Sequence, residues 1–164
     1  MKHILFFLLP LFCLTVQAQY GQLPVMGMLQ ESTIGTARAP RITVPMAMQL
    51  TDTCTVDPMN MQFIWTPAMP QSLTGPVTFT YNIRIVKLMP NQAPDYAIEH
   101  NPVVYKRNSL ITTSCVIPKK MVDNDFNNDA VYVVQVKAVP SSPRVVVEDN
   151  GMSPYVMFRM QEKK

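Results

Sequence analysis

Hydrophobic and polar residues alternate with a period of two along several segments of this chain. In "FTYNIRI" (79–85) and "VYVVQVKAV" (131–139), most apolar side chains fall on one face and the polar ones on the other. "MQFIWT" (61–66) and "SPYVMFRM" (153–160) repeat the pattern, and "SLITTSCVI" (109–117) is rich in β-branched residues. Successive side chains of a strand point to opposite faces of a sheet, so the pattern predicts half-buried antiparallel strands.

Helices are not predicted after the first residues of the chain. The sequence holds 15 prolines, and its segments lack an apolar repeat of 3.6 residues. Segment 89–108 is long for a connection between strands, and we expect it to carry a short edge strand around Tyr96–Glu99. The spacing of strands and turns predicts an all-β fold, a two-sheet antiparallel β-sandwich. The predicted core residues are Phe63, Trp65, Tyr81, Ile83, Tyr132, Val134 and Val136.

The first 18 residues have the layout of a secretory signal peptide. Lys2 precedes an apolar run, and Val16 and Ala18 fit the positions before a cleavage site. The run is shorter than the roughly 20 residues that span a bilayer, so no stable membrane span is predicted. We therefore expect a protein that is secreted to the periplasm, the outer surface or the extracellular space. Residues 19–39 are predicted to form a mobile N-terminal arm, and 40–164 one domain.

Charge and cysteine content narrow the possible partners. Without Lys2 the chain keeps 14 − 1 = 13 Lys and Arg residues against 11 Asp and Glu. This modest excess forms no basic stripe, so no nucleic-acid partner is predicted. Two cysteines remain after cleavage, Cys54 and Cys115. An even number in an exported protein predicts a disulfide, and two buried thiols are the alternative.

The residues that usually carry catalysis or bind metals are scarce. One histidine, His100, remains after cleavage, and neither cysteine belongs to a close Cys-x-x-Cys pair. "DNDFNND" (123–129) is interpreted as a turn rather than a Ca²⁺ loop, because it lacks the glycine and closing glutamate of an EF-hand. We therefore predict no enzyme activity, cofactor or metal. A hydrolase is an alternative that would need His100 in a pocket with an acid and a nucleophile.

Several motifs, taken in order, resemble a fibronectin type III domain. They are "WTP" (65–67) for its strand B, "YNIRI" (81–85) for strand C, "YVVQVKA" (132–138) for strand F, and "GMSPYV" (151–156) before its last strand. The resemblance covers about residues 55–160 and implies an immunoglobulin-like sandwich over most of 40–164. The sequence is also similar to accessory domains of secreted surface proteins of Gram-negative bacteria, some grouped under the TANFOR name. Because strands B and E pair in this family, the resemblance implies a Cys54–Cys115 bond.

The resemblance also implies a structural or adhesive role through protein contacts at the cell envelope. Sandwich domains often carry their binding residues on loops between strands. The long connection makes Tyr96, His100 and Tyr105 the candidate binding residues. A protein partner at the envelope or cell surface is therefore expected.

Carbohydrate binding is the alternative function for an exported β-sandwich. It would use exposed loop tyrosines such as Tyr96, Tyr105 and Tyr155 as platforms for sugar rings. The chain's single tryptophan, Trp65, is a further candidate platform. We expect Trp65 in the core instead, because it shares a strand face with Phe63 and a buried aromatic removes about 150–250 Å² from water.

Overall fold

The computed structural model describes residues 35–45, 52–73 and 75–161, all within one compact unit, Glu31–Lys164. The predicted signal peptide and most of the predicted arm lie outside the described residues. The strands are β1 (Gly35–Arg38), β2 (Ile42–Val44), β3 (Thr53–Val56), β4 (Gln62–Trp65), β5 (Met69–Leu73), β6 (Phe79–Leu88), β7 (Val103–Leu110), β8 (Ser114–Val116), β9 (Val131–Pro140), β10 (Val145–Val147) and β11 (Val156–Met160). The helices are α1 (Pro94–His100), α2 (Lys119–Asp125) and the 3₁₀ turn η1 (Glu148–Gly151).

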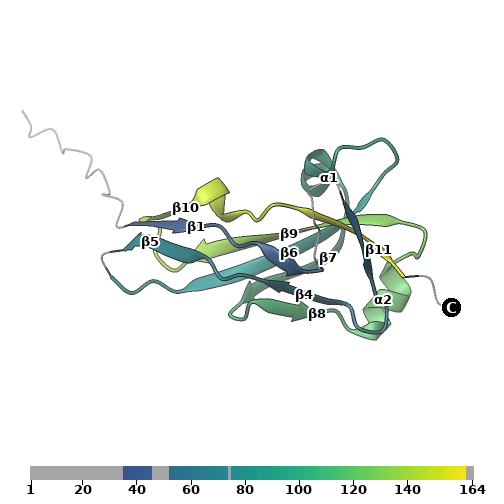
Figure 1. The fold of residues 1–164 in the computed structure, drawn as a ribbon, viewed down its shortest axis with the longest axis horizontal. Coiled ribbons are helices and arrows are strands. Elements are labelled where there is room, and N and C mark those ends of the chain that lie inside the picture. Colours follow the sequence, from purple (N-terminus) through teal and green to yellow (C-terminus); the bar gives the residue numbers. More distant parts are fainter. Residues whose placement is uncertain (1–34, 46–51, 74, 162–164) are drawn as a thin grey trace, which may run out of the picture. The chain divides into compact units, whose positions relative to one another are not determined.

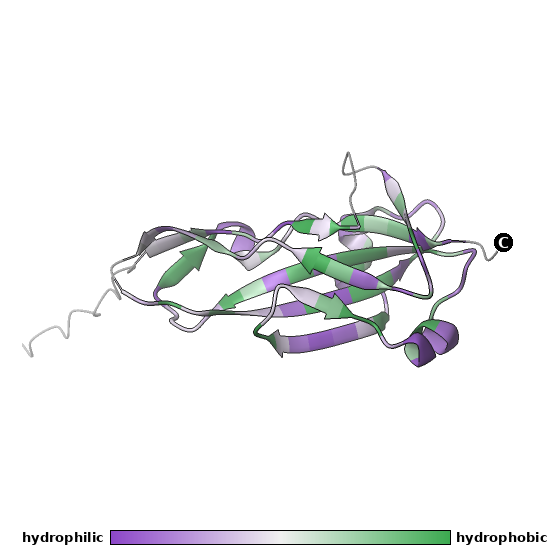
Figure 2. Ribbon diagram, turned by 60° about the horizontal axis from the view of Figure 1, so that its bottom comes forward, coloured by the Kyte–Doolittle hydropathy of each residue, from purple (hydrophilic) through white to green (hydrophobic). Residues whose placement is uncertain are grey.

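Two sheets pack face to face, as Figure 1 shows. The larger has the strand order β3-β11-β9-β6-β7, and its two long central strands, β6 and β9, pair antiparallel from Phe79↔Pro140 to Leu88↔Val131. The smaller has the order β2-β4-β8, with antiparallel pairing throughout. Figure 2 shows the alternation of hydrophobic and hydrophilic residues along these strands. The all-β character and the sandwich-like packing agree with the sequence prediction.

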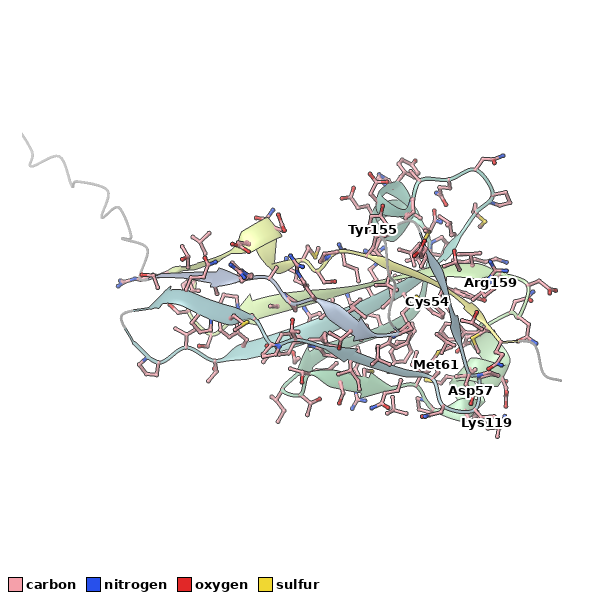
Figure 3. The ribbon with its side chains drawn as sticks, in the orientation of Figure 1. Cys54, Asp57, Met61, Lys119, Tyr155 and Arg159 are labelled. Carbon is pink, nitrogen blue, oxygen red and sulfur yellow. The ribbon has the colours of Figure 1, made fainter. Side chains whose placement is uncertain are left out.

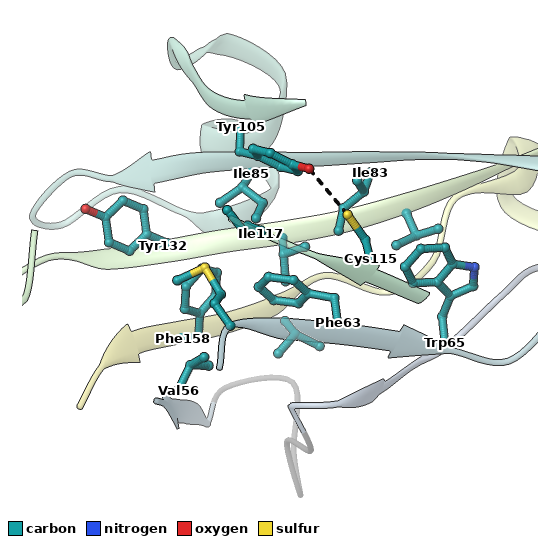
Figure 4. Close-up of a cluster of buried hydrophobic side chains, with 14 of the residues drawn as sticks. Val56, Phe63, Trp65, Ile83, Ile85, Tyr105, Cys115, Ile117, Tyr132 and Phe158 are labelled. Carbon is teal, nitrogen blue, oxygen red and sulfur yellow. Dashed lines mark hydrogen bonds between the residues drawn. The ribbon is translucent and has the colours of Figure 1, made fainter. Parts of the chain in front are cut away.

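The main core lies between the inner faces of these two sheets (Figure 4). Each of the seven residues expected in the core is at most 4% exposed. Trp65 on β4 packs against Tyr81 on β6, with ring centroids 5.7 Å apart. Phe63 meets Phe158 of β11 edge-on at 5.3 Å. These aromatic contacts join the two sheets.

A third sheet, with the order β10-β1-β5, was not expected. Its strand β1 pairs parallel with β10 and antiparallel with β5, and Ala37 is fully buried. Residues 35–39 therefore belong to the folded domain rather than to the predicted arm. The prediction of two antiparallel sheets is corrected accordingly, because β1–β10 and β3–β11 are parallel pairs. β1 was missed because its apolar face consists of Gly35 and Ala37, whose small side chains give little hydrophobic signal.

The prediction of no helix, and that of an edge strand around Tyr96–Glu99, are both wrong. That segment forms α1, which begins with Pro94 and buries Ala97 and Ile98. Proline suits the first helical position because its fixed φ matches the helix and its missing N–H would be unpaired there. At seven residues, α1 is too short to show a repeating apolar pattern. "DNDFNND" was predicted as a turn throughout, but its residues 123–125 end α2, and the turn is confined to Asn128 and Asp129.

The predicted strand 109–117 divides between two sheets. β7 ends at Leu110 in the larger sheet, and β8 begins at Ser114 in the smaller one. The residues between them include Ile111, which is 84% exposed. The chain crosses from one sheet to the other within this β-branched run, and hydrophobicity alone does not reveal such a crossing.

Candidate binding site at helix α1

Helix α1 covers one end of the outer face of the larger sheet. Its Ala97 and Ile98 pack against Val86 of β6 and Val133 of β9 in a second cluster of buried side chains. Both valines lie at positions where strict alternation would place polar residues. An apolar outer face needs a cover, and this break in the alternation is the sequence signal that could have predicted one.

The C-terminal end of α1 is tied to β6 by side chains. Arg84 Nη2 donates hydrogen bonds to the carbonyl oxygens of Glu99 and Asn101, at 3.4 and 3.5 Å. Asn101 Nδ2 donates to the Lys87 carbonyl at 2.7 Å. A guanidinium near the last carbonyls of a helix complements their negative partial charge. Hydrogen bonds with Arg84 and Lys87 of β6 thus hold the C-terminal end of α1 in place.

The structure brings two of the three predicted binding residues together. The rings of Tyr96 and His100 stack on α1 with centroids 4.0 Å apart and an interplanar angle of 10°. His100 Nδ1 lies 2.9 Å from the Tyr96 carbonyl oxygen, which fixes the imidazole along the helix. Tyr96 is 54% exposed. The pair therefore forms a preorganised aromatic surface facing solvent.

Tyr105, the third candidate, is a core residue and not part of a binding loop. It is 6% exposed on β7, and its Oη lies 3.4 Å from Cys115 Sγ. Burial, followed by the hydrogen bond with Cys115, raises the pKa of Tyr105 to about 12. Its position in the strand turns its side chain inward, whereas neighbouring Lys106 is exposed. The three tyrosines of the carbohydrate alternative therefore do not form one exposed platform.

Tyr155 lies beside the contact between α1 and the larger sheet. It lies near α1, where Figure 3 labels it, and packs against the cluster that contains Ile98. Its side chain is half-buried. Much of its ring surface therefore meets protein. Trp65, the other candidate for a sugar platform, is 2% exposed in the main core.

The predicted disulfide is not formed. Cys54 lies on β3 in the larger sheet, whereas Cys115 lies on β8 in the smaller one. β3 does not continue into β4 within the smaller sheet but crosses over and pairs with β11. Burial and nearby Asp52 raise the pKa of the Cys54 thiol. Cys54 and Cys115 therefore do not lie on neighbouring strands, as the resemblance to fibronectin type III implied.

Asp123 and Asp129 of "DNDFNND" line a groove of about 700 Å³ at the end of α2. Asp123 is engaged by Lys119, whose Nζ lies 3.0 Å from Asp123 Oδ2. Asn127 Oδ1 accepts a hydrogen bond from the Asp129 amide, which stabilises the turn after the helix. Within the described residues, no group of three or more His, Cys, Asp or Glu side chains is placed to hold a metal ion.

Comparison with known proteins finds no matching family model and no matching curated protein. Over 35–45, 52–73 and 75–161, no helix is long and apolar enough to cross a membrane. Among the described residues, the stacked rings of Tyr96 and His100 on α1 are the most distinctive exposed feature.

Proposed function

We propose that this protein is a secreted, non-enzymatic interaction module that binds a partner protein at the cell envelope through α1. The exposed Tyr96–His100 stack carries the proposal. Tyrosine is enriched among residues that dominate binding energy at protein interfaces. A side chain already held in place loses less freedom on binding, and the stack restrains both rings before any partner arrives.

A fibronectin type III-like topology is part of the same proposal. The strand order β2-β4-β8 supports it, as it corresponds to strands A, B and E of that family. The order β11-β9-β6-β7 corresponds to its strands G, F, C and C′. On this interpretation, α1 is an addition to the connection between two neighbouring strands of the larger sheet. Such additions are common sites of binding function on a rigid scaffold.

The predicted signal peptide supports a location in or beyond the envelope. An exported protein meets partners in the periplasm, on the cell surface or outside the cell. Structural and adhesive modules act in these places by binding other proteins. Fold analogy alone does not assign such a role, so the proposal relies on the exposed aromatic pair.

The proposal is tested by capture of partners from the native envelope with the tagged mature protein. Tyr96→Ala removes the exposed ring, while Ile111→Ala is the matched control. Ile111 is also a large exposed apolar residue, but it follows the end of β7 that is remote from α1. We expect the wild type and Ile111→Ala to capture the same protein, and Tyr96→Ala to bind it at least about 10-fold more weakly.

Two outcomes would contradict the proposal. One is equal capture by Tyr96→Ala and the wild type, with both folded by circular dichroism. The other is retention of purified envelope polysaccharide in the absence of any protein partner. The second result would favour the carbohydrate-binding alternative.

A further inference from the structure

A cleft of about 290 Å³ lies between α1 and the outer face of the larger sheet. Its polar lining includes Asn82, Arg84, Lys106, Gln135 and Lys137 from the strands, and Asp95 and Glu99 from α1. We propose that this cleft binds one acidic side chain of the partner protein. The inference rests on the proposed function, since it names the chemistry of the partner that docks at α1.

The charge balance of the cleft is the first argument. Three cations, on Arg84, Lys106 and Lys137, face two carboxylates, on Asp95 and Glu99, so the net charge is 3 − 2 = +1. In the part of the chain that the structure describes, no ion pair or hydrogen bond engages the ammonium group of either lysine. One further carboxylate would neutralise the cleft.

The strand register is the second argument. Arg84 on β6 is the direct cross-strand partner of Lys106 on β7. On the other side of β6, Asn82 is the partner of Lys137 on β9. Like charges directly opposite each other on a sheet are destabilising. An anion bound between the two cations would relieve their repulsion, so the arrangement favours binding of a carboxylate.

Hydrogen-bonding groups that remain available support the same ligand. Arg84 Nε is buried and lacks a hydrogen-bond partner among the described residues, and Nη2 makes only the two long bonds to the end of α1. Arg84 lines the cleft, and a guanidinium binds a carboxylate strongly and often with two N–H groups. Asn82 Oδ1 accepts a bond from the Ser109 amide, which fixes the side-chain amide in the cleft.

The shape and lining favour a side chain of a protein over a sugar acid. Ile98, Met152 and Tyr155 provide apolar surface that suits the aliphatic stem of a glutamate. Tyr155 is the sole aromatic residue of the described lining, and its half-buried side chain packs in part against the α1 cluster.

The direct test is nuclear magnetic resonance titration of the mature protein with acetyl-Glu-Glu-Glu-amide. Acetyl-Gln-Gln-Gln-amide and glucuronate are the comparison probes. We expect saturable shifts of the Arg84, Gln135 and Lys137 amides with the glutamate peptide only. Lys106→Gln combined with Lys137→Gln should weaken that binding about 10-fold. The matched control, Lys119→Gln combined with Lys120→Gln, makes the same charge change on α2 and should leave binding unchanged.

Three results would overturn the inference: no saturable shift, equal loss in both double variants, or saturation by glucuronate in place of the glutamate peptide. The same variants in the capture assay separate this inference from the proposed function. One outcome is that the Lys106/Lys137 double variant captures the partner as the wild type does, while Tyr96→Ala loses it. That outcome would refute binding of an acidic side chain in the cleft and would support docking of the partner at α1. If Tyr96→Ala also captures normally, docking at α1 fails as well.

Discussion

Truncating Trp65 should remove a large share of the domain's stability. Trp65 is 2% exposed, and its ring lies 5.7 Å from that of Tyr81 across the core. Replacing a buried aromatic by alanine leaves a cavity that the neighbours fill only in part, at a cost of about 3–5 kcal/mol. A domain of this size has a free energy of unfolding of about 5–15 kcal/mol. We therefore expect Trp65→Ala to be unfolded or strongly destabilised.

Trp65→Phe should behave differently, because the indole N–H is not satisfied. Nε1 is buried and has no hydrogen-bond partner among the described residues. An unsatisfied buried donor costs about 1–3 kcal/mol, and phenylalanine has no such group. This gain offsets part of the lost packing. We expect Trp65→Phe to lose about 1 kcal/mol or less of the free energy of unfolding.

Urea denaturation followed by far-ultraviolet circular dichroism measures both variants. Fluorescence serves only the wild type, because Trp65 is the chain's one tryptophan. Its emission should be blue-shifted and poorly quenched. Loss of less than about 1 kcal/mol in Trp65→Ala, or an equal loss in the two variants, would refute the reasoning, since packed aromatics lose far more on truncation to alanine.

Three further predictions concern ionisation, backbone and thiols. The ordinary tyrosine pKa is 10.0 and that of folded Tyr105 is about 12, so stability should fall as pH rises through this window, because the unfolded chain loses the proton first. Tyr105→Phe should reduce this decline in alkaline urea titrations, and an unchanged decline would contradict the cause. Gly151 has φ +81°, and a Cβ there would collide with the Ala138 carbonyl. Gly151→Ala should therefore lower stability by at least about 1–3 kcal/mol, and an unchanged melting temperature would argue against that geometry. Both Cys54 and Cys115 should accept an alkylating agent on unfolding without reductant, whereas a Cys54–Cys115 peptide in non-reducing mass spectrometry would contradict the fold.

Side-chain alternation was sufficient to predict β4, β6, β9 and β11, but not β3 and most of β7, whose Val56 and Tyr105 also belong to the main core. Phe63, Ile83 and Val134 lie on strands long or apolar enough for the period of two to be read directly. The pattern failed at β1, where small residues make up the buried face, and at α1, which spans fewer than two full repeats of an apolar stripe. Whether neighbouring strands share a sheet depends on where the chain crosses, and local hydrophobicity does not encode that.

The candidate site was predictable only in part, for a similar reason. The long connection between strands predicts Tyr96 and His100 as binding residues, but their stacking depends on helical spacing, which puts residues four apart on one face. The same connection predicts Tyr105 as a binding residue, and that prediction is wrong because Tyr105 is buried. The cleft depends on Arg84 and Lys106 being cross-strand partners, and the alternation of side chains along β6 and β7 does not specify that register.

Photo-cross-linking in the producing cells tests the central claim most directly. A benzoylphenylalanine replaces Tyr96 on α1 in one strain and Ile111, after β7, in another. Both positions are exposed, so a random encounter would label both. The account predicts a single cross-linked envelope protein from position 96 and none from position 111. Cross-linking of the same protein from both positions, or from position 111 alone, would contradict it.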